Sequence, residues 1–528
     1  MADGSERIYM ASTFFGLTIS YTGLQAANTS INVTAHNISN INTDGYTKEA
    51  AETQASKALR SYTTYGTLGS GVTVTEISQI RDTYYDEKYR NNQSYLGEYE
   101  TKDSYMNQIE NYLNEFTLEG FTSSYEDFYA ALKQAQITPS EESTLNEVVN
   151  KAASMTDYFN VLATNLRNVQ VDANNEVRDA VEQINSLAQN IASLNKQINQ
   201  VEACAGNAND LRDQRNALID DLAEYVNIST METDLGNGLT DFAVYIDGQP
   251  LISGYDYFTL ETVAREDPRN ASDADGLYDI KWSTGNTFNI YSDSLGGQLK
   301  ALIDIRDGCN GETEVLATDE DGNYLTDSDG NYYMTMQESP EKDTSFKGIP
   351  YYQSQLNQFI STFTSAVNDI LKSGYSSDGE HAGISLFVTQ NNTTSMTATN
   401  VTVNEELIND SSLFATKSSV AQGEANADII NKLLDLESSK IFDGGTGGFF
   451  LESIVSDMSI DASKATSFHT NYENLQTTIQ NQRLSIMGVD TDEEAMDLVK
   501  FQQAYNLNSK MMSVMNELYD RLINETGV

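Results

Sequence analysis

Both ends of this chain carry apolar side chains at the spacing that gives a helix one apolar face. Near the N-terminus a seven-residue repeat consists of Leu17, Leu24, Ile31 and Ile38. Small or apolar side chains predicted on the same face are Tyr21, Ala27, Thr34 and Ala35. A sustained heptad repeat makes a seam that needs a second helix for its burial. The helix is predicted to end before the turn signal Asp44-Gly45.

The C-terminal stretch contains a second seam, in which the spacing alternates between three and four residues. Its apolar members are Leu498, Phe501, Tyr505, Met512, Met515, Tyr519 and Leu522, and Asn508 is its polar member. Thr491 and Glu494 have the spacing of a capping box, which predicts that the helix begins here. We expect the two terminal helices to pair with each other, or with copies of themselves in an assembly. The alternative is two ordinary helices docked on a globular core.

The charge of the chain argues against two classes of partner. Its 528 residues include 78 acids and 31 bases, for a formal net charge of -47. Phosphate binding needs clustered Lys and Arg, so we expect no nucleic-acid partner and no anionic membrane partner. No apolar run is long enough to span a bilayer, which predicts no membrane insertion. The start is polar and lacks the pattern of a Sec-type signal peptide, and it leaves both Met1 and Met10 open as the first residue.

The sequence contains no recognisable catalytic, cofactor or metal motif. There is no Gly-x-Ser-x-Gly elbow, no phosphate-binding glycine loop and no His-Glu-x-x-His. Two cysteines and three histidines make a disulfide framework or a Cys/His zinc site a poor interpretation. His36 lies beside the Ile31–Ile38 stripe and is interpreted as an interface or surface residue. We therefore predict a non-enzyme without a cofactor.

The middle of the chain combines long helices with strands. Residues 145–201 predict a rod-like helix, with Val177, Ile184, Ile191 and Ile198 at one heptad position and Ala180, Leu187, Leu194 and Val201 at the other. From about residue 234 the period becomes strand-like, and strands are expected at 242–246, 251–263, 278–282 and 288–291. An acidic repeat at 319–333 is interpreted as turns between short strands, with calcium binding as the alternative.

These patterns predict a multidomain α+β fold. We predict three parts. The first is a coiled-coil-like terminal part that comprises residues 1–60 with 490–528. A mainly helical stem would comprise 61–233 with 351–489, and a β-rich insert would comprise 234–350.

Motifs at both ends of the chain and in its middle resemble the flagellar axial proteins, the family of rod, hook and hook-associated proteins. At the N-terminus the resemblance lies in Thr13 to Leu17, Gly23 to Ala26 and Asn37 to Thr47, and at the C-terminus in Gly488 to Ala495 and Phe501 to Tyr505. Two internal stretches agree with the hook-associated members, at residues 209–216 and 244–254.

The resemblance implies a structural protein that joins hook to filament and self-assembles, in a ring or helical array, through its terminal helices. It implies secretion to the cell exterior by the flagellar type III route without a cleaved signal. Implied partners are copies of itself, the hook protein, a second hook–filament junction protein, and an export chaperone on the C-terminal helix. It also implies that the terminal helices are largely unfolded in the free monomer. The alternatives are another axial protein, or an adhesin or hydrolase carried on an axial scaffold.

Overall fold

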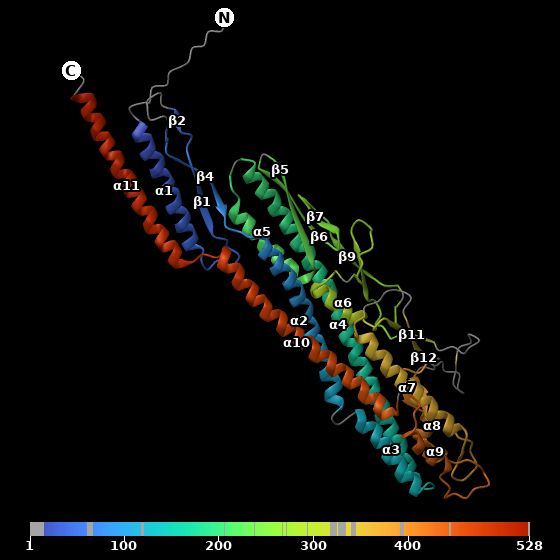
Figure 1. Ribbon diagram of the computed structural model, residues 1–528. Coiled ribbons are helices and arrows are strands. Elements are labelled where there is room, and N and C mark those ends of the chain that lie inside the picture. The colour runs from blue at the N-terminus through green and yellow to red at the C-terminus, as the bar shows by residue number, and fades with distance from the viewer. Residues whose placement is uncertain are drawn as a thin grey trace.

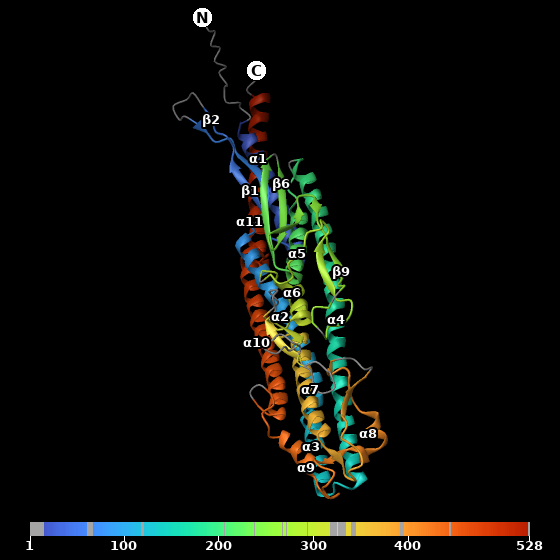
Figure 2. The same cartoon turned by 90° about the vertical axis from the view of Figure 1, so that its right-hand side faces the viewer.

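The computed structural model describes residues 15–60, 67–117, 121–204, 206–236, 238–266, 268–270, 272–292, 294–316, 325, 334–338, 345–390, 395–442 and 445–525. The chain forms an elongated α+β molecule with long helices along its axis and small sheets on one side (Figure 1). The first and last helices, α1 (Phe15–Ser39) and α11 (Thr491–Asn524), lie at the same end of the molecule (Figures 1 and 2). Within the described ranges, no helix is both long and apolar enough to cross a membrane. Apart from residue 325, the acidic repeat predicted at 319–333 lies outside these ranges.

The two termini form one unit. Helix α1 (Phe15–Ser39) packs on helix α11 (Thr491–Asn524), and strands β1 (Glu49–Ala55) and β4 (Val72–Gln79) cover another side of α1. The two strands are antiparallel, and the short strands β2 (Leu59–Arg60) and β3 (Thr67–Leu68) extend the same hairpin. The terminal helices therefore pair with each other within one chain, as the seams predicted.

The stem begins where α2 (Thr83–Thr117) packs along α10 (Gly447–Met487). Aromatic side chains line this contact: Tyr95 stacks on Tyr472 with ring centroids 5.2 Å apart, and Tyr99 lies 4.9 Å from Phe468. Helix α3 (Phe121–Ile137) follows at the far end of the molecule.

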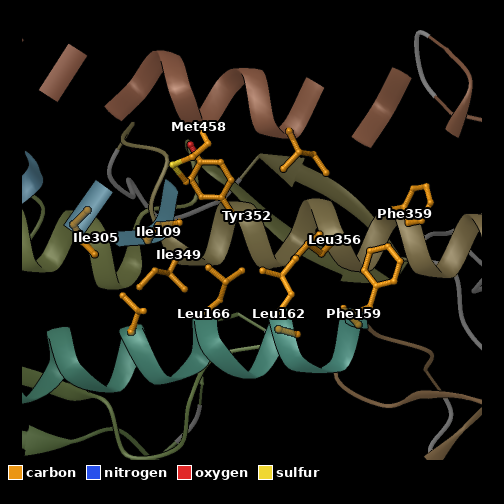
Figure 3. Close-up of a cluster of buried hydrophobic side chains, with 14 of the residues drawn as sticks. Ile109, Phe159, Leu162, Leu166, Ile305, Ile349, Tyr352, Leu356, Phe359 and Met458 are labelled. Carbon is orange, nitrogen blue, oxygen red and sulfur yellow. The ribbon is translucent and has the colours of Figure 1, made fainter. Parts of the chain in front are cut away.

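The predicted rod is α4 (Glu142–Glu202), a single helix of 61 residues. Its heptad positions from Val177 to Ile198 are buried as expected, except that Leu187 is half-buried. Val201 is exposed at the end of the helix. The helix packs on α3, α5 (Asn209–Tyr225), α6 (Gly297–Asp307) and α7 (Ile349–Lys372) of the same chain. In Figure 3, Leu162 and Leu166 of α4 point toward Ile349 and Leu356 of α7, and Met458 of α10 closes the core from the other side.

Small sheets lie along α4. The largest contains β5 (Ile228–Gly236), β6 (Leu239–Ile246), β7 (Gln249–Ser253) and β8 (Asp256–Tyr257) in that order. Strands β9 (Leu260–Ala264) and β10 (Tyr278–Trp282) form one pair, and β11 (Glu312–Leu316) and β12 (Met334–Glu338) form another. The strand predicted at 288–291 is wrong. Phe288 and Ile290 are buried in a loop, so their apolar character reflects core packing rather than strand pairing.

Short elements cap the end of the stem that lies away from the termini. The pairs are β13 (Tyr375–Ser376) with β16 (Ala415–Lys417), and β14 (Phe387–Thr389) with β15 (Val401–Val403). Helices α8 (Glu405–Asn409) and α9 (Asp428–Leu436) complete this end. Residues 428–487 thus contain two helices, α9 and α10, separated by a loop.

Amide side chains on α4 attach the sheets to this helix. Asn185 donates to the carbonyl of Leu260 and accepts from its N–H, both at 2.8 Å. Asn199 makes the same pair of bonds with Thr240, at 2.7 and 2.9 Å. Each amide satisfies both backbone groups of a strand residue, as a neighbouring strand would. The helix thus takes the place of a neighbouring strand at the edge strand β9 and at the start of β6, where β6 extends beyond its pairing with β7.

Candidate assembly interface

Helices α1 and α11 run antiparallel with small residues at the points of closest approach. Gly16 lies against the side chain of Met515, and Gly23 lies against Asn508. The two glycines are seven residues apart, as are their two partners. A Cβ atom on Gly23 would lie 2.7 Å from Oδ1 of Asn508, closer than a normal contact. The glycines therefore let the two helix backbones approach closely.

The structure places most of the predicted seam residues in half-buried positions on this pair. Half-buried seam residues are Leu17, Leu24, Ile31, Ile38, Leu498, Phe501, Tyr505, Met512, Met515 and Tyr519. The exception is Leu522, which is 55% exposed near the free end of α11. On α1 the fully buried side chains are small instead: Ser20, Ala26, Ala27, Ser30, Val33, Thr34 and Asn37. The placement of Tyr21 and Ala35 on the buried face is wrong, because both are exposed.

A second apolar stripe on α11 has no cover within the described part of the chain. Its exposed members are Met496, Val499, Leu507, Met511, Val514, Leu518 and Ile523. From Leu507 onward most of these residues immediately precede a seam residue, so the two stripes adjoin on the helix surface. Together they form an apolar arc wider than one partner helix can cover. The sequence spacing of three and four residues from Leu507 to Leu518 is the signal that indicates this stripe.

The N-terminus of α11 is fixed by a different cap from the one predicted. Asp490, not Thr491, is the N-cap, and its carboxylate accepts from the N–H groups of Asp492 and Glu493 at 2.8 and 3.1 Å. Glu494 is instead 2% exposed and pairs with Lys48 at 3.1 Å. The capping-box prediction is therefore wrong, because a competing carboxylate one residue earlier takes the cap and Glu494 has a tertiary partner.

Lys48 connects the two terminal segments through charge. Its Nζ lies 2.8 Å from Glu493 and 3.1 Å from Glu494. Burial lowers the pKa of Lys48, but the hydrogen bonds to these two carboxylates outweigh that effect and leave the pKa above its ordinary value. The lysine therefore stays charged and holds the start of α11 against the segment that follows α1.

Asn37 organises the turn between α1 and β1. Its side chain donates to the carbonyl of Glu49 at 2.9 Å and accepts from the N–H of Glu49 at 3.0 Å. The hydroxyl of Tyr46 donates to the same amide oxygen at 2.8 Å. The buried amide thus satisfies the first residue of β1 and positions the tyrosine of the turn.

A buried chain of ion pairs joins the terminal unit to the stem. The carboxylate of Asp213 on α5 accepts from the N–H and hydroxyl of Thr47, at 2.9 and 2.7 Å, and from Arg81 at 3.1 Å. Arg81 also pairs with Asp86 at 2.6 Å, and Asp86 pairs with Arg483 of α10 at 2.8 Å. Three stem helices, α2, α5 and α10, are therefore cross-linked beside the turn that follows α1. Such a network fixes an orientation even where its net contribution to stability is small.

Two cavities lie near these elements and are lined mainly by polar groups. One, of about 710 Å³, lies between the turn at residues 40–47 and the C-terminal end of α10. Another, of about 610 Å³, lies between α2, α4 and α5 and contains four carboxylates, those of Glu100, Asp172, Glu176 and Glu224. Burial and the neighbouring carboxylate of Glu100 raise the pKa of Glu224, although a hydrogen bond from Gln93 opposes the shift. Neither lining contains a cysteine or histidine.

The chain is similar to several flagellar proteins. Residues 106–387 match the family model of the flagellar hook-associated protein FlgK helical domain. Residues 17–47 match a flagella basal body rod protein model, and residues 480–525 match the C-terminal model of the flagellar basal body rod FlgEFG proteins. The two rod models thus fall on α1 with its turn and on the end of α10 with α11.

Full-length relatives and a solved structure agree with these matches. Flagellar hook-associated protein 1 of Bacillus subtilis is 28% identical, over 98% of this chain and 99% of the relative. The protein of the same name from Escherichia coli is 24% identical, over 95% of this chain and 98% of the relative. The flagellar hook junction protein FlgK from Burkholderia pseudomallei shares the fold, with a TM-score of 0.56 and 14% identity over 76% of this chain and all of that structure.

Proposed function

Because this chain belongs to the family of the flagellar hook-associated protein FlgK helical domain, we propose that it joins the hook to the filament of a bacterial flagellum. It is a structural flagellar protein whose similarity to hook-associated protein 1 extends over nearly its full length. A role at the junction requires a surface that engages other axial subunits. The observation that carries the proposal is the apolar stripe that α11 leaves exposed after α1 has covered the adjoining seam.

The proposed assembly uses the two stripes of α11 differently. The seam keeps α11 on α1 within a subunit, and the exposed stripe contacts the terminal helices of neighbouring copies. Burial of each half-exposed apolar side chain on the stripe contributes about 1 kcal/mol. A single pair of helices buries little surface, so the terminal unit gains much of its order from its neighbours. In the free monomer these helices are accordingly expected to be less ordered than the stem.

The proposed partners follow from this arrangement. Copies of the chain form a ring or helical array, with the hook protein on one side and a second junction protein on the other. Before assembly, an export chaperone covers the apolar face of the C-terminal helix. The chain leaves the cell by the flagellar type III route without a cleaved signal and acts outside the cell.

The proposal includes a non-enzymatic role. The remaining candidates are another type of axial protein, or an adhesin or hydrolase carried on an axial scaffold. A hydrolase would need reactive groups gathered in the segment predicted as the insert, residues 234–350. Turnover by the purified chain in broad hydrolase screens would favour the enzyme over the junction protein.

The test is a charge placed on the exposed stripe. Leu507→Glu and Val514→Glu should prevent filament attachment, so that cells retain hooks and shed unassembled filament protein into the medium. Lys510→Glu is the matched control, since it places the same residue type at an exposed polar position of α11. Normal filaments on cells that carry both stripe variants would overturn the proposed interface. Filaments on cells that lack the protein would overturn the junction role itself.

A further inference from the structure

Two carboxylates at the junction of the terminal unit and the stem have no basic partner from lysine or arginine in the described part of the chain. They are Glu49, the first residue of β1, and Asp210, in the first turn of α5. The nearby cations are already paired, since Lys48 contacts Glu493 and Glu494, and Arg81 contacts Asp86 and Asp213. Glu49 is 9% exposed, so its charge is largely removed from water. A buried carboxylate in this position favours a positive charge beside it.

The phenol of Tyr46 is exposed to the same excess of negative charge. Burial raises the pKa of its phenol, and the charges of Glu49, Asp210, Asp213 and Glu494 raise that pKa further. Tyr46 is therefore held neutral beside these carboxylates.

His36 completes the cluster from the C-terminal end of α1. Its Nδ1 lies 3.3 Å from Oε2 of Glu49 and 3.1 Å from the hydroxyl of Tyr46. One ligand atom from each of His36, Glu49 and Asp210 lies within 4.8 Å of the others. Two ligand atoms on a tetrahedral zinc ion are about 3.4 Å apart. The separation of His36 and Glu49 is therefore close to that of two ligands on one ion.

We propose that His36, Glu49 and Asp210 bind one divalent transition-metal ion of the zinc class. An imidazole nitrogen with two carboxylates suits zinc, cobalt or manganese better than calcium or magnesium, which take oxygen ligands. Asn209 donates to Oε1 of Glu49 at 2.7 Å and leaves Oε2 oriented toward the imidazole. Such an outer hydrogen bond is the usual means of orienting a metal-ligating carboxylate.

The ion would link three segments that are far apart in the sequence: α1, β1 and α5. It would therefore hold the terminal helix pair at one orientation to the stem. The proposed metal site is supported by the geometry of the cluster and does not depend on the proposed flagellar role. An ion that binds only the folded arrangement also stabilises it, by an amount that rises with the logarithm of the ion concentration above the Kd.

The experiment uses the full-length chain after treatment with a chelator. Cobalt(II) and then zinc are titrated in excess magnesium, which occupies the weak oxygen sites of this acidic surface. We expect one saturable equivalent, a cobalt absorption spectrum typical of low coordination number, and competition by zinc. His36→Gln and Asp210→Asn should each weaken zinc binding at least tenfold, while circular dichroism confirms that the stem remains folded.

The chain supplies its own matched controls. His469 and His381 each face a single carboxylate, Asp103 at 3.0 Å and Asp378 at 3.9 Å. His469→Gln and His381→Gln should leave the zinc affinity unchanged. Zinc binding that is equally strong in His36→Gln and the unaltered chain overturns the proposal. The absence of a saturable equivalent also overturns it and leaves an ordinary ion pair between His36 and Glu49.

Discussion

Gly23 of α1 lies directly against the side chain of Asn508 of α11, with the amide where a Cβ atom would otherwise project. Asn508 is the one polar member of the C-terminal seam, and its Nδ2 donates to the carbonyl of Ala504 at 2.9 Å. Because the amide satisfies its donor within its own helix, it can face the glycine without a partner on α1. The contact between Gly23 and Asn508 therefore defines the register in which the two terminal helices pack.

The antiparallel register predicts a specific cross-link. In a Cys204→Ser background, the double variant Gly23→Cys with Asn508→Cys should form an intramolecular disulfide under mild oxidation, because the two positions are adjacent across the interface. Gel mobility with and without reductant measures the yield. Gln25→Cys with Asn508→Cys is the control, since Gln25 is exposed on α1. Equal yields from the two pairs would indicate that the observed register is not populated.

Asn37→Ala should loosen the start of β1. The substitution removes the partners of the N–H and the carbonyl of Glu49, and it also removes the acceptor of Tyr46. We expect a local cost of about 2 kcal/mol, because buried backbone groups lose their hydrogen bonds. Amide hydrogen exchange of residues 45–55 should accelerate more than tenfold. Asn32→Ala, at an exposed position of the same helix, should leave exchange in that segment unchanged.

Asn185→Ala should detach β9 from α4. The variant loses both bonds to Leu260, which leaves an N–H and a carbonyl without partners on a half-buried edge. A destabilisation of about 1 to 3 kcal/mol is expected, measured as a lower urea midpoint of the stem. Asn190→Ala removes the same type of side chain from the exposed face of α4. A loss of similar size in both variants would contradict the role of the strand contact, because the higher helix propensity of alanine favours α4 in both.

Glu232 should contribute to stability at neutral pH and lose that contribution in acid. Burial raises the pKa of its carboxyl, but the charges of Arg215 and Arg212 outweigh burial and hold the pKa below the ordinary value of 4.5. The contribution is therefore present above about pH 4.5 and is lost as the pH falls toward the lower value of the folded state.

The corresponding measurement compares unfolding curves at pH 7 and in the acid range below pH 4.5. The variant Glu232→Gln should be less stable than the unaltered chain at pH 7 and should show a flatter decline in acid. Glu182→Gln, on the exposed face of α4, serves as the control for removal of one negative charge. If Glu232→Gln and the unaltered chain lost stability identically as the pH falls, the proposed contribution of Glu232 would be contradicted.

Local periodicity was sufficient to predict most of the helices. The heptads of α4 and the seams of α1 and α11 depend only on which residues recur at helical spacing, and this information is local. The turn at Asp247-Gly248, where both residues have positive φ, likewise depends on the identity of neighbouring residues only. For the same reason the sequence predicted that the ends form apolar helices that need partners.

Tertiary packing decided which partner each face received. Phe288 and Ile290 have the composition of a strand but fill a buried loop, and Glu494 has the spacing of a cap but pairs with Lys48. The cluster of His36, Glu49 and Asp210 joins residues up to 174 positions apart, so no local pattern could predict it. The sequence alone determined which segments are helical and which faces are apolar, since backbone periodicity is a property of neighbouring residues. The fold alone decided which charges meet and which stripe of α11 stays exposed, because those contacts form between segments that the chain brings together only on folding.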